Sequence, residues 1–230
     1  MAKITLGYWK IRGLAQVIRH LLSYTELEFE EVFYETKEKW YNEDKKNLGL
    51  VFPNIPYIID GDFKLTESIA VAKYIIKKSG RTELLGKNVQ DEGKVENLIG
   101  VFNDALKDIK GLFWNKDYEA LKTEALEKAR SKLNYIRDFI GENQFALGYL
   151  TLVDFYLAEN LAYFETLYPS EEANYKFWWN IRKNLNSLPG IKAYYKRPNA
   201  VNGPYLPSYA SLPVKIREKH VEPANDGVIV

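Results

Sequence analysis

Cysteine and histidine, two residue types that often act in catalysis or bind metals, are scarce in this chain. It has no cysteine, so it offers no disulfide framework, thiolate metal site or cysteine nucleophile. Its two histidines lie far apart, His20 in an apolar helical pattern and His220 in a polar tail. A Ser–His–Asp triad or a histidine metal site therefore has little to build from, and we expect no bound metal.

Hydroxyl groups are abundant instead. The chain has 17 tyrosines, and Tyr8 stands near the end of residues 3–9, a short segment that is expected to form a strand. A phenolic hydroxyl can donate a hydrogen bond to an anion. A tyrosine near a strand end is nevertheless most often a packing residue, so its position alone gives Tyr8 no role in chemistry.

The elements that would position Tyr8 alternate between strand and helix. Apolar residues recur at helical spacing over Gly13–Tyr24, and Phe29–Tyr34 alternates as a second strand. A polar stretch that ends at Leu50 is expected to form an irregular helix. Two short apolar runs then flank Asp60-Gly61, which is the strongest local signal for a hairpin because glycine accepts a positive φ.

An amphipathic helix is expected over Glu67–Lys78 and is stopped by Ser79-Gly80. The resulting order, β-α-β-α-β-β-α, is that of a thioredoxin-like domain. We place this domain at residues 1–82.

Helical spacing dominates the rest of the chain after a polar linker at residues 81–93. The expected helices are residues 94–114, 118–140, 151–168 and 171–185. Thr151 and Asp154 have the spacing of a capping box, which starts a core helix and has no role in chemistry. We therefore expect an all-helical domain at residues 90–207 and, because periodicity then ends, an extended tail at residues 208–230.

Composition limits the classes of partner. The formal net charge is +1, so no electrostatic signature of nucleic-acid binding or of an anionic membrane surface is present. No stretch approaches the roughly 18 apolar residues of a membrane span, and none has the pattern of a secretory signal. We expect a cytoplasmic protein that binds small neutral or zwitterionic molecules.

Three segments together resemble the mu class of glutathione S-transferases: Gly7–Leu22, Leu48–Ser68 and Leu150–Glu159. The resemblance covers about residues 3–207. It implies a glutathione S-transferase fold, an α/β domain followed by an all-α domain, in a homodimer. It also implies an enzyme of detoxification that conjugates glutathione, its co-substrate, to small hydrophobic electrophiles.

The same resemblance assigns site residues. Tyr8 matches the catalytic tyrosine that stabilises the glutathione thiolate. The positions that match the glutathione site are Trp9, Leu14, Trp40, Lys45, Asn54, Ile55, Pro56, Glu67 and Ser68, with Pro56 in the cis form. Trp114 and the tail residue Tyr209 are expected to line the electrophile pocket.

These residue types suit the ligand. Glutathione has two carboxylates and an ammonium group, so its site needs a cation such as Lys45 and an acceptor such as Glu67. It also needs donors at a helix start, as at Ser68. A cis peptide bond before Pro56 would turn the backbone of Ile55 to pair with the ligand peptide as a strand does.

Two departures mark the chain as a divergent member. Val101 stands where the family has an aspartate that reaches across the dimer to the ammonium group of the ligand, so we expect that contact to be lost or moved. Trp114 replaces a second tyrosine near the electrophile. An indole can line an apolar pocket, but it cannot donate to an epoxide oxygen as a tyrosine hydroxyl does.

Two other functions remain open at this point. A glutathione-dependent isomerase would use the same thiolate and differ only in its second pocket, and product analysis would separate the two. A non-catalytic structural or ligand-binding protein could use the same fold, alone or in a larger assembly. Retention on immobilised glutathione, followed by elution with glutathione, would favour the enzymes.

Overall fold

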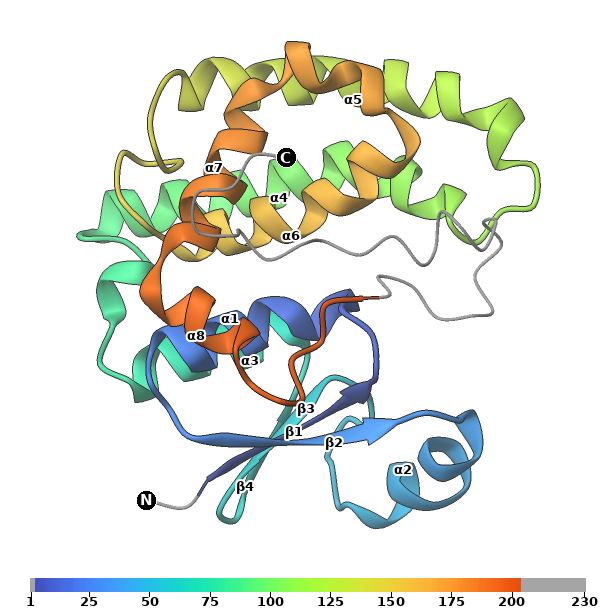
Figure 1. The fold of residues 1–230 in the computed structure, drawn as a ribbon, viewed down its shortest axis with the longest axis vertical. Coiled ribbons are helices and arrows are strands. Elements are labelled where there is room, and N and C mark those ends of the chain that lie inside the picture. Colours follow the sequence, from blue (N-terminus) through green and yellow to red (C-terminus); the bar gives the residue numbers. More distant parts are fainter. Residues whose placement is uncertain (1–2, 204–230) are drawn as a thin grey trace.

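The computed structural model describes residues 3–203. These residues form a small sheet with helices against it and, beyond these, a larger group of helices (Figure 1). The expected tail, Tyr209 and His220 lie outside the described residues.

The first domain has the expected thioredoxin-like arrangement. Its strands are β1 (Ile4–Trp9), β2 (Phe29–Tyr34), β3 (Tyr57–Asp60) and β4 (Phe63–Thr66). They lie in the order β2-β1-β3-β4, with β1 and β2 parallel and the other neighbours antiparallel. The hairpin predicted at Asp60-Gly61 is confirmed, since Gly61 has a φ of 60° between β3 and β4.

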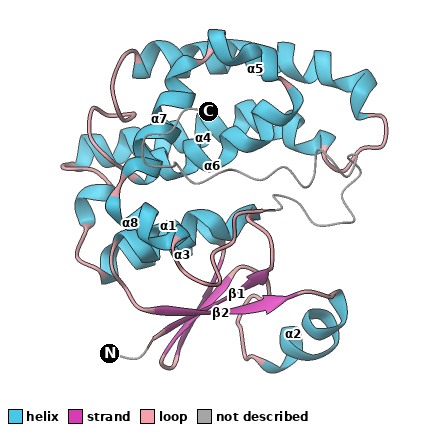
Figure 2. Cartoon of the chain, in the orientation of Figure 1, coloured by secondary structure: helices cyan, strands magenta, loops and turns pink. Residues whose placement is uncertain are grey.

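Helices α1 (Gln16–Tyr24) and α3 (Ser68–Lys78) lie on the face of the sheet toward the helical domain (Figure 2). A single 3₁₀ turn, Gly13–Ala15, precedes α1. The polar stretch before Leu50 is irregular, as expected: a π-helical turn at Lys39–Asp44 leads into the short α2, Lys45–Asn47.

The second domain is helical, as expected. After a 3₁₀ turn at Thr82–Leu84 come the helices α4 (Val89–Leu112), α5 (Tyr118–Ile140) and α6 (Leu152–Leu167). A second 3₁₀ segment, Pro169–Asn174, leads to α7 (Lys176–Ser187) and α8 (Pro189–Tyr195). None of the helices within residues 3–203 is long and apolar enough to cross a membrane.

The starts of two helices differ from the prediction, and one helix was not predicted. Helix α7 begins at Lys176 and not at residue 171, because residues 169–174 form the 3₁₀ segment. The polar linker is shorter than expected because α4 begins at Val89, where Asn88 Oδ1 accepts a hydrogen bond from the N–H of Asp91 at 2.9 Å. The short helix α8 was not predicted. It packs against α1, with the Ser23 hydroxyl donating to the carbonyl of Gly190 at 2.7 Å.

Helix α6 is the centre of the helical domain, and most of its residues are buried. The predicted capping box at its start is confirmed: Asp154 Oδ2 accepts hydrogen bonds from the backbone N–H and the hydroxyl of Thr151, at 2.8 and 3.1 Å. Asp154 Oδ1 also accepts from the N–H of Ala146 at 2.7 Å. This carboxylate therefore joins the start of α6 to the loop before it.

Candidate functional site

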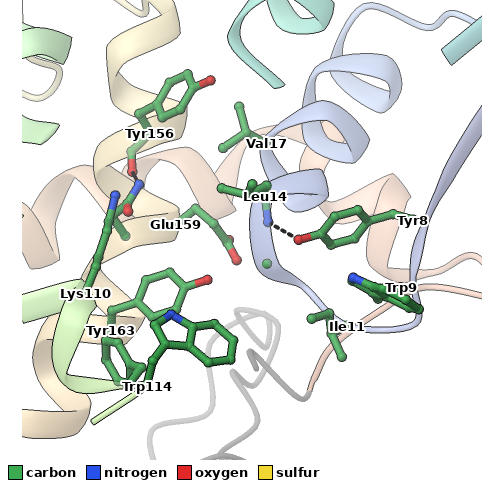
Figure 3. Close-up of a pocket in the computed structure, with 13 residues that line it drawn as sticks. Tyr8, Trp9, Ile11, Leu14, Val17, Lys110, Trp114, Tyr156, Glu159 and Tyr163 are labelled. Carbon is green, nitrogen blue, oxygen red and sulfur yellow. Dashed lines mark hydrogen bonds between the residues drawn. The ribbon is translucent and has the colours of Figure 1, made fainter. Parts of the chain in front are cut away.

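A cavity of about 290 Å³ lies between the two domains. One wall comes from the end of β1, the turn that follows and α1, and the other from α4 and α6 (Figure 3). The lining residues are Tyr8, Trp9, Ile11, Gly13, Leu14, Val17, Lys110, Phe113, Trp114, Tyr156, Glu159, Asn160 and Tyr163. Apolar and aromatic side chains dominate, which suits an organic ligand with a hydrophobic body.

Tyr8 is held at this wall by the turn that follows β1. Its hydroxyl accepts a hydrogen bond from the backbone N–H of Leu14 at 3.1 Å (Figure 3). The turn passes so close to the ring that a Cβ at Gly13 would lie 2.7 Å from the Tyr8 hydroxyl, and Gly13 has a φ of 42°. Glycine is therefore needed at position 13 both for its backbone conformation and for space.

Arg19 also holds the turn between β1 and α1 in position. It is fully buried on α1, pairs with Glu31 at 2.6 Å, and donates to the carbonyls of Ile11 and Arg12 at 2.8 and 3.3 Å. Because these carbonyls lie between Tyr8 and Leu14, the position of the tyrosine hydroxyl depends on a buried and satisfied polar group.

Several of the residues predicted for glutathione lie at one end of the sheet, where β1 ends and β3 begins. Gly7 pairs with Tyr57, and Tyr57 pairs with Thr66. This register places Pro56 and Glu67 at the same end of the sheet as Tyr8. The peptide bond between Ile55 and Pro56 is cis, as expected.

Glu67 and Ser68 lie at the start of α3. Glu67 has a φ of 67°, and its carboxylate accepts a hydrogen bond from the Asn54 amide at 3.3 Å. The side chain of the N-cap residue Glu67 does not cap the backbone N–H groups at the start of α3. Uncapped N–H groups at a helix start can bind an anionic group.

Trp9, Trp40 and Lys45 have different surroundings. Trp9 lines the cavity and contacts Tyr34 edge to face, with ring centroids 6.1 Å apart. Trp40 is buried and stacks on Tyr57, with centroids also 6.1 Å apart. Lys45 lies over the ring of Tyr41 at 5.3 Å. Trp40 and Lys45 do not line the interdomain cavity, so their contact with glutathione stays a prediction.

Leu14 and Trp114 stand at the opening of the cavity. Their exposed fractions are 55% and 52%, large values for apolar side chains. They come from opposite walls, Leu14 from the turn before α1 and Trp114 from the end of α4 (Figure 3). Trp114 thus lines the cavity, and its contact with an electrophile stays a prediction, while Tyr209 lies outside the described residues.

A buried ion pair that the sequence did not reveal crosses the domain boundary. Arg12 donates to both carboxylate oxygens of Glu159 on α6, at 3.0 and 2.6 Å, and each side chain is only 4% exposed. Arg12 also donates to the Tyr195 hydroxyl on α8 at 2.8 Å. The two charges are 147 residues apart, and no local spacing could have joined them.

Lys110 was also missed, because a lysine in a helical pattern is ordinarily assigned to the solvated face. It lies on α4 at the helical wall of the cavity. Burial lowers the pKa of its ammonium group to about 8.

Comparisons with known proteins agree over most of the chain. Residues 4–77 match the family described as "Glutathione S-transferase, N-terminal domain". A glutathione S-transferase of Tyrophagus putrescentiae is 33% identical over 211 residues, which cover 88% of this chain and 95% of that protein. A class-mu 26 kDa isozyme of Schistosoma mansoni is 35% identical over 86% of this chain and 90% of its own length.

A solved structure of the same family is also similar to this chain. The crystal structure of the glutathione S-transferase Blo t 8 matches with a TM-score of 0.79 and 27% identity, and covers 90% of this chain and 99% of that one.

Proposed function

Since this chain belongs to the glutathione S-transferase family, we propose that it conjugates glutathione to small hydrophobic electrophiles and that Tyr8 stabilises the thiolate. One observation carries this proposal. The Tyr8 hydroxyl is oriented by the N–H of Leu14 at the wall of an apolar interdomain cavity. A hydroxyl fixed before the ligand arrives loses little freedom when it binds the sulfur.

One hydroxyl can supply most of the free energy needed to lower the pKa of the glutathione thiol. A free thiol with a pKa of about 8.5 is only a few per cent ionised at pH 7. Lowering that pKa by about 2 units takes roughly 2.7 kcal/mol. A hydrogen bond to a charged group contributes about 1.5–3 kcal/mol, so Tyr8 supplies most of the stabilisation.

The chemical step needs no covalent enzyme intermediate. The thiolate attacks an electrophilic carbon of the acceptor, a sulfur–carbon bond forms, and the leaving group departs with the bonding electron pair. Leu14, Trp9 and Trp114 hold the acceptor body against the sulfur. The cavity raises the rate by keeping the two reactants close and oriented.

The rest of glutathione would lie at the same end of the sheet as Tyr8. Its peptide would pair with the backbone of Ile55 beside the cis bond, and the start of α3 at Ser68 would bind a carboxylate. Glu67, which Asn54 orients, would accept from the ammonium group. Trp40 and Lys45 complete the proposed site.

We also propose a homodimer, on the basis of two exposed apolar features. Val51 and Phe52, in the loop before β3, are 82% and 74% exposed. A groove of about 180 Å³ lies between α4 and α5 and is lined in part by Val101, Tyr135 and Phe139. In one chain the loop before β3 lies in the sheet domain, away from α4 and α5 (Figure 1).

The Phe52 loop of one protomer would fill the groove of its partner. A two-fold axis would repeat the contact, because such an interface is self-complementary. Val101 would thereby serve the interface in place of a contact to the ligand.

The variant Tyr8→Phe tests the catalytic role, because it removes one oxygen and keeps the ring. The pKa of enzyme-bound glutathione should rise by about 1–2 units, and conjugation at neutral pH should fall roughly ten- to a hundredfold. Glutathione affinity should change little. Thiolate absorbance of the complex against pH measures the first effect.

Tyr149→Phe is the matched control, since it removes a hydroxyl that bonds Asp91 outside the cavity. An unchanged titration in Tyr8→Phe, with an active wild type, would assign the thiolate to another donor. A wild type that shows neither thiolate nor conjugation would contradict the proposed function.

A further inference from the structure

The charged side chains that line the cavity differ in their surroundings. Within residues 3–203, the lining includes one carboxylate, Glu159, and one ammonium, Lys110. Glu159 is neutralised by the two hydrogen bonds from Arg12. The cavity therefore has a net positive charge on its helical wall.

The Lys110 ammonium has no hydrogen bond or ion pair with any described residue. On the same helix, Lys94 pairs with Asp91 at 3.1 Å. The lowered pKa, about 8, still leaves the Lys110 ammonium mostly protonated at neutral pH. A partly buried cation without a counterion favours the binding of an anion.

The residues proposed for the glutathione carboxylates lie at one end of the sheet in the first domain, whereas Lys110 belongs to the opposite wall of the cavity (Figure 3). The anion at Lys110 would therefore belong to the acceptor. The cavity lining also includes apolar and aromatic side chains, among them Phe113 and Trp114 on the same segment as Lys110. A ligand that fits both features has an aromatic or aliphatic body and one negative charge.

We propose that Lys110 makes the acceptor side of this cavity selective for hydrophobic electrophiles that carry a carboxylate. The proposal rests on the proposed function and names its substrate class. The ammonium binds the carboxylate, and the apolar wall between Lys110 and Tyr8 holds the body that the thiolate attacks. Lys110 is a residue that determines specificity and takes no part in bond making.

The test compares two acceptors that differ by one group, a chlorodinitrobenzene and its ring-carboxylated counterpart. For each, kcat/KM is divided by the uncatalysed rate constant with glutathione, which removes the difference in intrinsic reactivity. The ratio of the carboxylated to the neutral acceptor should fall about tenfold or more in Lys110→Met. Lys110→Arg, which keeps the charge, should retain most of the ratio.

Lys107→Met is the matched control, because Lys107 lies one turn earlier on α4 and is exposed; its ratio should equal that of the wild type. An unchanged ratio in Lys110→Met would overturn the proposal, even with an active enzyme. A wild type inactive on both acceptors would overturn the proposed function instead.

In that case, the binding of unreactive naphthalene carboxylate and of naphthalene is measured by calorimetry. A preference for the carboxylate that Lys110→Met abolishes would support the Lys110 site independently of catalysis. Equal binding of the two probes to both proteins would overturn it.

Discussion

His20 is a buried histidine on α1 that the proposed reaction does not use. Its Nε2 lies 3.0 Å from the Tyr195 hydroxyl and 3.2 Å from the Gln16 amide. Burial lowers its pKa well below 6.5, and the nearby positive charges of Arg12 and Arg19 add to the effect. The folded protein therefore keeps His20 neutral at a pH where an unfolded chain would protonate it.

This difference in protonation makes the free energy of unfolding depend on pH. Below pH 6.5 the unfolded state binds one more proton than the folded state, so this contribution to stability is present above pH 6.5 and is lost as the pH falls. Between pH 7.5 and 5.5 the loss should be about 1.4 kcal/mol for one group. Urea unfolding at both pH values measures it.

His20→Gln is the comparison for that experiment. It should lack the His20 contribution, so its free energy of unfolding should change less than that of the wild type over the same interval. Asp154, whose pKa burial raises to about 6, contributes with the opposite sign, but equally in both proteins. Identical pH dependence in the two proteins would show that His20 is protonated in the fold.

At the scale of elements, the start of α6 depends on Asp154. Its carboxylate accepts from the N–H of Ala146 and from the N–H and hydroxyl of Thr151. Asp154→Ala would leave these donors buried without partners, at a cost of about 1–3 kcal/mol each when unsatisfied. We expect the free energy of unfolding to fall by about 3 kcal/mol or more, measured by urea denaturation.

Asp138→Ala is the control, because Asp138 is exposed and, within residues 3–203, pairs with the neighbouring Arg137 on the surface of α5. It should change stability by less than about 0.5 kcal/mol. A loss of under about 1 kcal/mol in Asp154→Ala would mean that water replaces the carboxylate in this loop.

Sequence patterns predicted the elements that local chemistry determines. The bounds of α5, residues 118–140, were predicted from apolar spacing, and the β3–β4 turn from its Asp-Gly pair. Helix α8 has seven residues, too few for a periodic signal, and it is stabilised by contact with α1. Elements that depend on distant contacts leave little trace in the sequence.

The candidate site likewise contains residues that the sequence predicted and residues that it did not reveal. Tyr8 and Leu14 are six residues apart, within one segment that a family resemblance can match. The Arg12–Glu159 pair and the place of Lys110 at the cavity wall depend on how the two domains dock. No local pattern encodes that docking.

At the scale of the whole molecule, the proposed homodimer makes a direct prediction. Phe52→Ser removes the apolar side chain that would enter the partner's groove. Burial of one such side chain contributes roughly 1.5–3 kcal/mol, and a two-fold dimer has two copies of the contact. We expect the variant to be monomeric at micromolar concentration while the wild type is dimeric, as measured by light scattering.

Leu121→Ser is the matched control, an exposed apolar residue near the start of α5 and well away from the groove residues Tyr135 and Phe139. It should leave the dimer intact. A monomeric wild type would contradict the homodimer, and a dimeric Phe52→Ser protein would place the interface elsewhere.

The Arg12–Glu159 pair has a consequence for how an acceptor reaches the sulfur. Swinging the domains apart like a hinge would break the two hydrogen bonds between Arg12 and Glu159. An acceptor that reaches the sulfur while this pair is intact has to pass between Leu14 and Trp114, so we expect the distance between these two side chains, rather than domain motion, to limit the size of acceptor that binds.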